Sequence, residues 1–200
     1  VPVFCDGEPL FWAVSRAHHA DIGAPVPTTY LPLAKTIYEE GIHLPCIRSH
    51  EQYRERDEIM RMCKMKIRVP ELWYGDFQAQ VGACRIGERR LKELTNRYGR
   101  DVIKTFIEEW MAYGSRRMIA EIANFPKGEW SFETRHDPVP GVAEDGIPVK
   151  VTVRVDPEEG RITVDARDNV DCVPGGLNLT EATALASCRI GVFYNLDPAL

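Results

Sequence analysis

Residues 147–167 read IPVKVTVRVDPEEGRITVDAR, and this stretch decides the fold class. In residues 147–155 apolar side chains alternate with other residues, which is the period of two expected of a strand with one buried face. The segment 156–160, DPEEG, has the composition of a tight turn, and the alternation resumes in residues 161–167. Residues 147–167 therefore predict an antiparallel hairpin, and the alternation in residues 130–134 predicts a further strand before it.

The chain before these strands shows the period that is typical of helices. Apolar residues recur three and four positions apart in residues 51–68, 76–98 and 101–124, and a proline or glycine follows each run. A last apolar run predicts a further helix over residues 180–194. Apolar helix faces of this kind usually belong to a protein core, so we expect the first three helices to form a layer that packs on itself.

The amino-terminal residues predict a second hairpin. Residues 1–15 contain two apolar runs around the turn pair Asp6-Gly7, and the prolines at 25, 27 and 32 then predict an extended loop. The fold class expected is α+β: an N-terminal β-hairpin and site loop, a helical layer, then antiparallel strands and a further helix. We expect two regions, 1–125 and 126–200. Because the chain begins without Met on a strand-like segment, both should be parts of one larger subunit.

The composition is that of a soluble globular protein, with 44% hydrophobic and 28% charged residues. A formal net charge of −5 argues against a nucleic-acid partner. No stretch approaches the ~18 unbroken apolar residues of a membrane helix, and no signal segment opens the chain, so we expect no membrane partner and a cytoplasmic location. The 6 cysteines include no Cys-x-x-Cys pair, which argues against a zinc ribbon or a redox dithiol.

The strongest candidate site lies where the N-terminal hairpin runs into the loop, at residues 16–21, RAHHAD. An imidazole and a carboxylate three residues apart, as in His18 and Asp21, can both turn toward one divalent ion. The alternative is a hydrogen-bonded histidine beside a solvated aspartate. For His19 the choices are a ligand, a hydrogen-bond donor behind the ligands, or a packed ring, and we favour the roles other than ligand.

Other polar residues have simpler explanations. Glu40 and His43 form another candidate pair, but charged turn residues are ordinarily solvated. Asp76 directly precedes an apolar run and is predicted to be a helix N-cap. Solvated ion pairs on a helix face are predicted for Glu88 with Arg85, Arg89 and Arg90. The Gly175-Gly176 pair lacks the Gly-x-x-x-x-Gly-Lys pattern, so no ATP cradle is predicted, and no catalytic residue is assigned.

A family resemblance is carried by several motifs in order. They are residues 16–23, RAHHADIG; residues 37–42, IYEEGI, with Leu44-Pro45; residues 75–80, GDFQAQ, followed by residues 87–91, GERRL; and residues 173–178, VPGGLN. These motifs resemble the RAHHADIGG, IYQEGL-x-IP and GDL-x-AQ … G-x-RRL segments and a later loop of the hydantoinase B / 5-oxoprolinase / acetone carboxylase alpha-subunit family. The resemblance spans essentially the whole chain, and linked motifs in order are more specific than any one alone.

The resemblance has implications for metal and nucleotide binding. It implies that His18 and Asp21 are ligands of a divalent metal, Mn²⁺, Zn²⁺ or Fe²⁺, with further ligands from a Gly-Gly-Thr-His-x-x-Asp-type stretch that would lie upstream. Ala24 stands where the family commonly has glycine, and this departure, followed by Pro25, bears on the conformation of the loop. The resemblance also implies that ATP is bound by a partner, a hydantoinase A-like subunit, in a hetero-oligomer.

The function that the resemblance implies is that of a metal-bearing subunit in an ATP-dependent multi-subunit enzyme. Its substrate would be a small carbonyl compound. The leading expectation is hydrolysis of cyclic amides such as hydantoin, 5-oxoproline or a lactam. Two alternatives stay open: ATP-dependent carboxylation of a ketone, as in acetone or acetophenone carboxylases, and a scaffold subunit without catalytic function. A requirement for bicarbonate would distinguish the carboxylase from the hydrolase.

Overall fold

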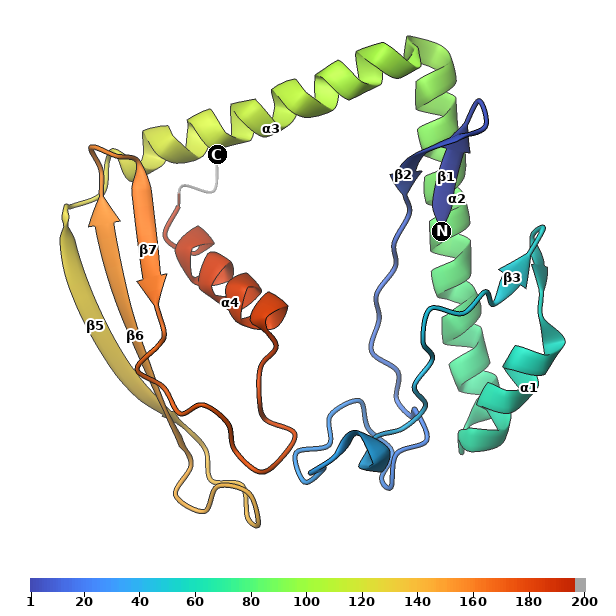
Figure 1. Ribbon diagram of the computed structural model, residues 1–200, viewed down its shortest axis with the longest axis horizontal. Helices are drawn as coiled ribbons and strands as arrows, with labels where there is room; N and C mark the ends of the chain where they lie inside the picture. The colour runs from blue at the N-terminus through green and yellow to red at the C-terminus, as the bar shows by residue number, and fades with distance from the viewer. Residues whose placement is uncertain (197–200) are drawn as a thin grey trace. The chain divides into compact units, whose positions relative to one another are not determined.

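The computed structural model describes residues 1–196, over which the chain forms four α-helices, one 3-10 helix and seven β-strands (Figure 1). The chain divides into two compact units, Val1–Ile103 and Lys104–Leu200. Residues 197–200, at the end of the predicted second region, lie outside the described residues. The predicted boundary between residues 125 and 126 stays a prediction about the larger subunit. Over residues 1–196 no helix is both long enough and apolar enough to cross a membrane.

The first unit opens with the predicted hairpin, formed by strands β1 (Pro2–Cys5) and β2 (Glu8–Trp12), which pair antiparallel. Asp6 and Gly7 make the turn, both with positive φ. Val3 and Cys5 are buried, and they pack against Cys84 on helix α2 (Pro70–Tyr98). The alternation of the first residues thus places one face of the hairpin on a helix, and the prediction for residues 1–15 is confirmed.

Helix α1 (Asp57–Lys66) packs against the first turns of α2. The core between them contains Met60, Cys63, Ile67 and Trp73, all of them buried. The helix predicted over residues 51–68 is shorter than expected, because its first residues instead form part of a small two-stranded sheet, β3 (His50–Glu51) with β4 (Arg54–Glu55). The turn of that sheet contains Gln52 and Tyr53 at positive φ, a backbone conformation that a helix excludes.

The predicted N-cap role of Asp76 is wrong. Helix α2 begins at Pro70, so Asp76 lies in its second turn rather than before its start. A proline suits the first helical position because its fixed φ matches the helix and no amide hydrogen is needed there. Pro70 therefore begins α2, whereas α1 already ends at Lys66.

Glu88 on α2 corrects the expectation of a solvated cluster. Its side chain is only 8% exposed and accepts hydrogen bonds from Tyr53 Oη at 2.8 Å, Arg85 Nη1 at 3.0 Å and Lys92 Nζ at 2.7 Å. Burial alone would raise the pKa of Glu88, but these hydrogen bonds outweigh it and lower the pKa to about 2. The cluster fastens the β3–β4 turn to α2. The arginines at 89 and 90 form exposed ion pairs, but with Glu93 rather than with the predicted Glu88.

Helix α3 (Arg100–Ile122) follows α2 after Gly99 and lies mainly in the second unit. Its aromatic side chains stack along the helix, with 5.9 Å between the ring centroids of Phe106 and Trp110. Both rings are exposed, and among the described residues of α3 only Ile122 is buried. The predicted helical layer is therefore confirmed for α1 and α2, whereas the apolar side chains of α3 are not covered by the described part of the chain.

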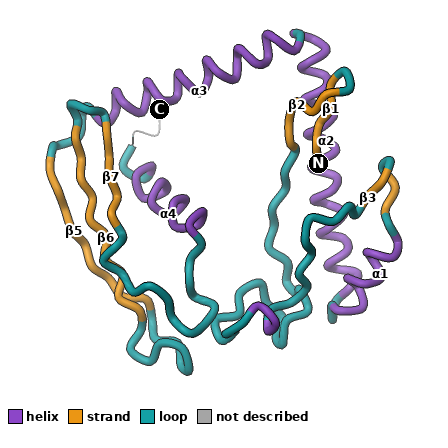
Figure 2. The backbone as a smooth tube through the Cα atoms, in the orientation of Figure 1, coloured by secondary structure: helices purple, strands orange, loops and turns teal. Residues whose placement is uncertain are grey.

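The second unit contains the predicted antiparallel sheet, with the strand order β5–β6–β7 (Figure 2). Its strands are β5 (Gly128–His136), β6 (Ile147–Asp156) and β7 (Arg161–Asp165). Trp130 and Val164 both stand opposite Val153, so one face of the sheet is apolar. Helix α4 (Glu181–Phe193) follows, and the Thr180 side chain caps it by accepting a hydrogen bond from the Thr183 amide. The sequence-based assignment as α+β is confirmed.

Candidate functional site

The loop after β2 carries a buried carboxylate, Asp21, which is 2% exposed. Its Oδ1 accepts hydrogen bonds from the Gly23 amide at 2.9 Å and from Arg68 Nη1 at 2.7 Å. Its Oδ2 accepts one from the Arg68 amide at 2.8 Å. Burial alone would raise the pKa of Asp21, but the hydrogen bonds from Gly23 and Arg68 and the charge of Arg68 hold it below its ordinary value. Asp21 is therefore ionised in the folded chain at neutral pH.

Arg68 anchors this loop to the junction between α1 and α2. The Arg68 guanidinium also donates to the Ala24 carbonyl, so this one side chain forms hydrogen bonds with both Asp21 and Ala24. A side chain at position 23 would have no room, since an added Cβ on Gly23 would lie 2.7 Å from the Lys66 carbonyl oxygen. The Ile42 amide donates to the Ile22 carbonyl at 2.7 Å and fastens the loop from a second direction. The loop conformation is thus set by contacts with distant segments, and Ala24 is accommodated in it.

The two histidines of the loop have different surroundings. His18 is exposed and stacks on Tyr30, with 5.7 Å between the ring centroids. His19 packs toward α2, where its Nε2 lies 2.9 Å from Gln80 Nε2 and its ring lies 6.1 Å from that of Trp73. The Nδ1 atom of His19 is buried, and no atom of the described chain forms a hydrogen bond with it. His18 is therefore open to ligands from outside the described residues, whereas His19 faces the interior of the first unit.

The donor chemistry at this loop fits a divalent ion only as part of a larger set of ligands. A carboxylate has about four lone-pair positions, and three hydrogen bonds to Asp21 leave about one for a metal. His18 can supply an imidazole nitrogen. Over residues 1–196 no three His, Cys, Asp or Glu side chains lie together in an arrangement that could hold a metal. His18 and Asp21 can therefore supply at most two ligands, and a metal site here would need further ligands from outside residues 1–196.

The remaining residues discussed from sequence have structural explanations. His43 Nε2 lies 3.6 Å from Glu40 Oε2, and both side chains are about half exposed, in agreement with a solvated pair. In the loop of residues 173–178, the Asn178 side chain holds the turn by hydrogen bonds with Val173 and Gly175. Sequence reasoning missed Arg68 and Gln80. They lie 47 and 61 residues from their partners in the loop, and no local spacing connects them.

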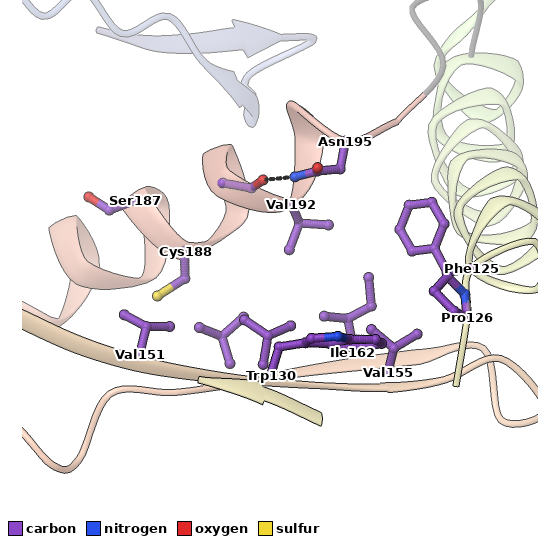
Figure 3. A pocket seen from close by; sticks show the side chains of 13 residues that line it. Phe125, Pro126, Trp130, Val151, Val155, Ile162, Ser187, Cys188, Val192 and Asn195 are labelled. Carbon is purple, nitrogen blue, oxygen red and sulfur yellow. Dashed lines mark hydrogen bonds between the residues drawn. The ribbon is translucent and has the colours of Figure 1, made fainter. Parts of the chain in front are cut away.

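The second unit contains a larger, open apolar cavity of about 650 Å³ between the sheet and α4 (Figure 3). Trp130, Val151 and Ile162 line it from the sheet, and Cys188 and Val192 point toward them from α4. The polar side chains on its border bond to carbonyl groups of α4: Ser187 Oγ donates to the Thr183 carbonyl, and Asn195 Nδ2 to the Gly191 carbonyl. This cavity therefore offers apolar surface but few directed groups for orienting a polar substrate.

The family model described as hydantoinase B/oxoprolinase matches residues 1–199. The beta subunit of the caprolactamase of Pseudomonas jessenii is 36% identical over 192 residues, which cover 96% of this chain and 32% of that protein. One of the subunits of a putative D-/L-hydantoinase of Pseudomonas sp. (strain NS671) is 33% identical over 173 residues, covering 82% of this chain and 28% of that protein. The chain thus spans about a third of the length of these relatives.

Solved structures give the same result for the fold. The crystal structure of the ATP-dependent caprolactamase from Pseudomonas jessenii matches with a TM-score of 0.85 and 30% identity, covering 96% of this chain and 33% of that chain. A nucleotide-free acetone carboxylase structure matches with a TM-score of 0.83 over 99% of this chain and 27% of that chain, at 16% identity. The second likeness shows a shared fold alone.

Proposed function

The chain belongs to the hydantoinase B/oxoprolinase family, and we propose that it forms part of the metal-bearing subunit of an ATP-dependent enzyme that hydrolyses cyclic amides. The observation that carries this proposal is the 36% identity to the caprolactamase beta subunit over 96% of the chain. Within that span lies the HHAD segment, 18–21, whose acid is buried, ionised and held by Arg68. A loop fixed in this way suits a site in which an imidazole and a carboxylate must keep their positions.

The chemistry requires activation of the ring, because the carbonyl of a cyclic amide is a poor electrophile at neutral pH. ATP can convert the carbonyl oxygen into a phosphate ester, which is more readily attacked. A divalent ion such as Mn²⁺, Zn²⁺ or Fe²⁺, held by His18 and Asp21 with ligands from outside residues 1–196, would supply Lewis-acid polarisation. In this chain Arg68 keeps the Asp21 carboxylate ionised and oriented, and Tyr30 stacks on the ring of His18.

The proposed assembly is a hetero-oligomer in which a hydantoinase A-like partner binds ATP. Support comes from the two relatives, which are named as single subunits of a caprolactamase and of a putative hydantoinase. The Gly175-Gly176 loop is held by Asn178 and has no Gly-Lys pair of the kind that cradles phosphates, so this chain is not proposed as the nucleotide-binding part. The small-molecule substrate and the cytoplasmic location expected from the sequence remain part of this proposal.

The two alternative functions are a ketone carboxylase and a scaffold subunit, and the test of the proposal distinguishes it from both. The acetone carboxylase structure shares the fold, but at 16% identity this likeness does not support a carboxylase reaction for this chain. A carboxylase would consume ketone only when bicarbonate is present. A scaffold subunit would leave turnover indifferent to substitutions at His18 and Asp21.

The test uses the complete subunit together with its ATP-binding partner. Caprolactam, hydantoin and 5-oxoproline are offered with and without ATP, and ketones with and without bicarbonate. We expect ATP-dependent ring opening without bicarbonate. His18→Ala and Asp21→Asn should each reduce turnover by more than about 100-fold and lower the metal content, since loss of a ligand exceeds the ~10 to 100-fold effect of a supporting group.

His136→Ala is the matched control, because His136 is an exposed histidine on β5 whose ring bonds only the adjacent Asp137 carbonyl within the described residues. It should keep both metal and rate. Full turnover and an unchanged metal content in His18→Ala would show that the proposed site is wrong. Product that forms only with bicarbonate would replace the hydrolase by a carboxylase.

A further inference from the structure

A small cavity of about 200 Å³ lies beside the HHAD loop, within the first unit. His19 and Ile22 line it from the loop, and Trp73, Phe77 and Gln80 line it from successive turns of α2. The rings of Trp73 and Phe77 are nearly parallel, with 5.4 Å between their centroids and 12° between their planes, and together they form the aromatic wall of the cavity. An aromatic wall with aliphatic side chains around it suits a compact apolar ring.

The polar groups of the cavity are one imidazole and one carboxamide. His19 Nε2 and Gln80 Nε2 lie 2.9 Å apart, and this is the hydrogen bond that the Gln80 side chain forms within residues 1–196. A carboxamide offers two N–H donors and an oxygen with two lone pairs, so Gln80 retains both a donor and an acceptor. A cyclic amide presents one C=O and one N–H at adjacent positions of its ring. Gln80 therefore carries the groups that complement it.

His19 has unused hydrogen-bonding capacity as well. Its Nδ1 is buried, and no group in residues 1–196 bonds with it. Buried polar atoms in native proteins nearly always have a partner, and leaving one without a partner costs about 1–3 kcal/mol. His19 and Gln80 thus both retain hydrogen-bonding groups that have no partner within residues 1–196.

The charged side chains near the cavity indicate whether a neutral or a charged ring can bind there. Among the described residues that line it there is no Asp, Glu, Lys or Arg. Arg68, the cation that anchors the adjacent loop, already donates to Asp21 and to Ala24. A carboxylate placed in this cavity would lose part of its hydration without meeting a counter-charge, which is unfavourable. A neutral ring meets no such penalty.

We propose that this cavity binds the ring of a neutral lactam, with Gln80, itself held by His19, hydrogen-bonding its amide and Trp73 and Phe77 lining the cavity beside the ring. The inference rests on the proposed function, and it selects among the cyclic amides. An unsubstituted lactam fits, whereas 5-oxoproline, whose ring carries a carboxylate, does not. The cavity volume of about 200 Å³ is smaller than the roughly 300–1,000 Å³ of sites for drug-sized ligands, as expected for a ligand that consists of one small ring.

Direct binding to the complete subunit with its partner, without ATP, tests this site separately from turnover. The probes are 2-pyrrolidinone and 5-oxoproline, which share one five-membered lactam ring and differ by the carboxylate. Tryptophan fluorescence reports binding, and the signal should disappear in Trp73→Phe, which keeps an aromatic wall. We expect 2-pyrrolidinone to bind at least about 10-fold more tightly than 5-oxoproline. Equal or tighter binding of 5-oxoproline by the unmodified protein would overturn the proposal.

The variant that addresses the polar pair is Gln80→Ala, and its matched control is Gln78→Ala. Gln78 lies on the same helix but bonds Glu55 and Tyr74 outside the cavity. Loss of one hydrogen bond to the ring should weaken 2-pyrrolidinone about 10-fold in Gln80→Ala and leave Gln78→Ala unchanged. If the enzyme opens lactams with ATP but Gln80→Ala binds them normally, the site assignment fails and the proposed function stands. If no cyclic amide binds or is opened, both fail.

Discussion

Asp21 and Glu88 are both buried acids in the first unit, and both accept three hydrogen bonds, yet their partners come from different distances along the chain. Glu88 takes two of its donors from its own helix, Arg85 three residues before it and Lys92 four residues after it. Asp21 takes two of its three from Arg68, 47 residues away. The Glu88 cluster therefore reinforces a helix that would form without it, whereas the pair of Asp21 and Arg68 determines where a loop lies.

The difference has a functional side. A helix already fixes the backbone around Glu88, so that its cluster adds stability and fastens one turn of a small sheet. The loop of residues 18–24 has no regular structure, and its conformation depends on Arg68, Gly23 and the contact between Ile22 and Ile42. The candidate ligands lie on this loop, and so does His19, one of the two polar residues that line the small cavity. We therefore expect substitution of Arg68 to disturb the candidate site, and substitution of Glu88 to lower stability without disturbing that site.

The largest effect is expected from Arg68→Ala. It leaves the Asp21 carboxylate buried without its guanidinium, and loss of one partner from a buried pair costs about 3–5 kcal/mol. Because the Arg68 side chain is 43% exposed and its amide still donates to Asp21, we expect a smaller loss, about 2–3 kcal/mol of unfolding free energy, by urea denaturation of the complete subunit. Proteolysis within residues 16–50 should also become faster.

Lys92→Ala is the matched comparison, since it removes one cation from the other acid and leaves two donors in place. It should lose about 1 kcal/mol and keep the loop resistant to protease. Arg68→Lys should recover part of the stability, because it restores the charge but cannot reach both Asp21 and the Ala24 carbonyl. Equal losses in Arg68→Ala and Lys92→Ala would remove the distinction between the two acids.

The same contrast explains what could be predicted from the sequence. The strands of residues 147–167 follow from a period of two, and α2 and α3 follow from helical spacing, because both patterns are local. Helical spacing also predicts ion pairs for Arg89 and Arg90, although the acid that they contact is Glu93 rather than the predicted Glu88. The burial of Glu88 does not, because it depends on Tyr53 and on the hairpin that α2 carries. Charge spacing alone cannot tell a covered helix face from an exposed one.

For the candidate site, the sequence identified the loop but not its contacts. His18 and Asp21 were selected as a pair, and the structure gives them separate partners, Tyr30 and Arg68. Nothing in the spacing of the loop points to a residue just before Pro70 or to Gln80. Those contacts exist because α1 and α2 fold back alongside the loop, which is a property of tertiary packing. Whether the two residues share a metal stays a prediction.

Acid should affect the Glu88 cluster over a defined range. Its folded pKa of about 2 is below the ordinary 4.5, so the ionised form stabilises the fold. This contribution is fully present above pH 4.5 and is lost as the pH falls toward 2. A shift of this size corresponds to at most about 3 kcal/mol.

Urea denaturation at several pH values between 5 and 2.5 measures this contribution. Glu88→Gln should be less stable at pH 5 and should converge toward the unmodified protein as the pH falls. Glu93→Gln, at an exposed acid on the same helix, should run parallel to the unmodified protein. The pKa of Asp21 is also lowered, so some loss of stability in acid should persist in Glu88→Gln. A constant difference between Glu88→Gln and the unmodified protein would contradict the lowered pKa of Glu88.

The smallest effect is expected from Tyr53→Phe. The hydroxyl of Tyr53 donates to Glu88 Oε1, but Lys92 Nζ donates to the same oxygen at 2.7 Å, so Oε1 keeps a partner without it. The ring also remains, with the Arg85 guanidinium 4.2 Å from its centroid. Loss of one hydrogen bond whose acceptor stays paired should lower the free energy of unfolding by about 0.5–1 kcal/mol. Tyr53→Ala, which also removes the ring, should cost more, and the difference measures how far the ring contact holds the β3–β4 turn on α2. If Tyr53→Phe costs as much as Arg68→Ala, Glu88 depends on one distant contact just as Asp21 does, and the two acids belong to one class.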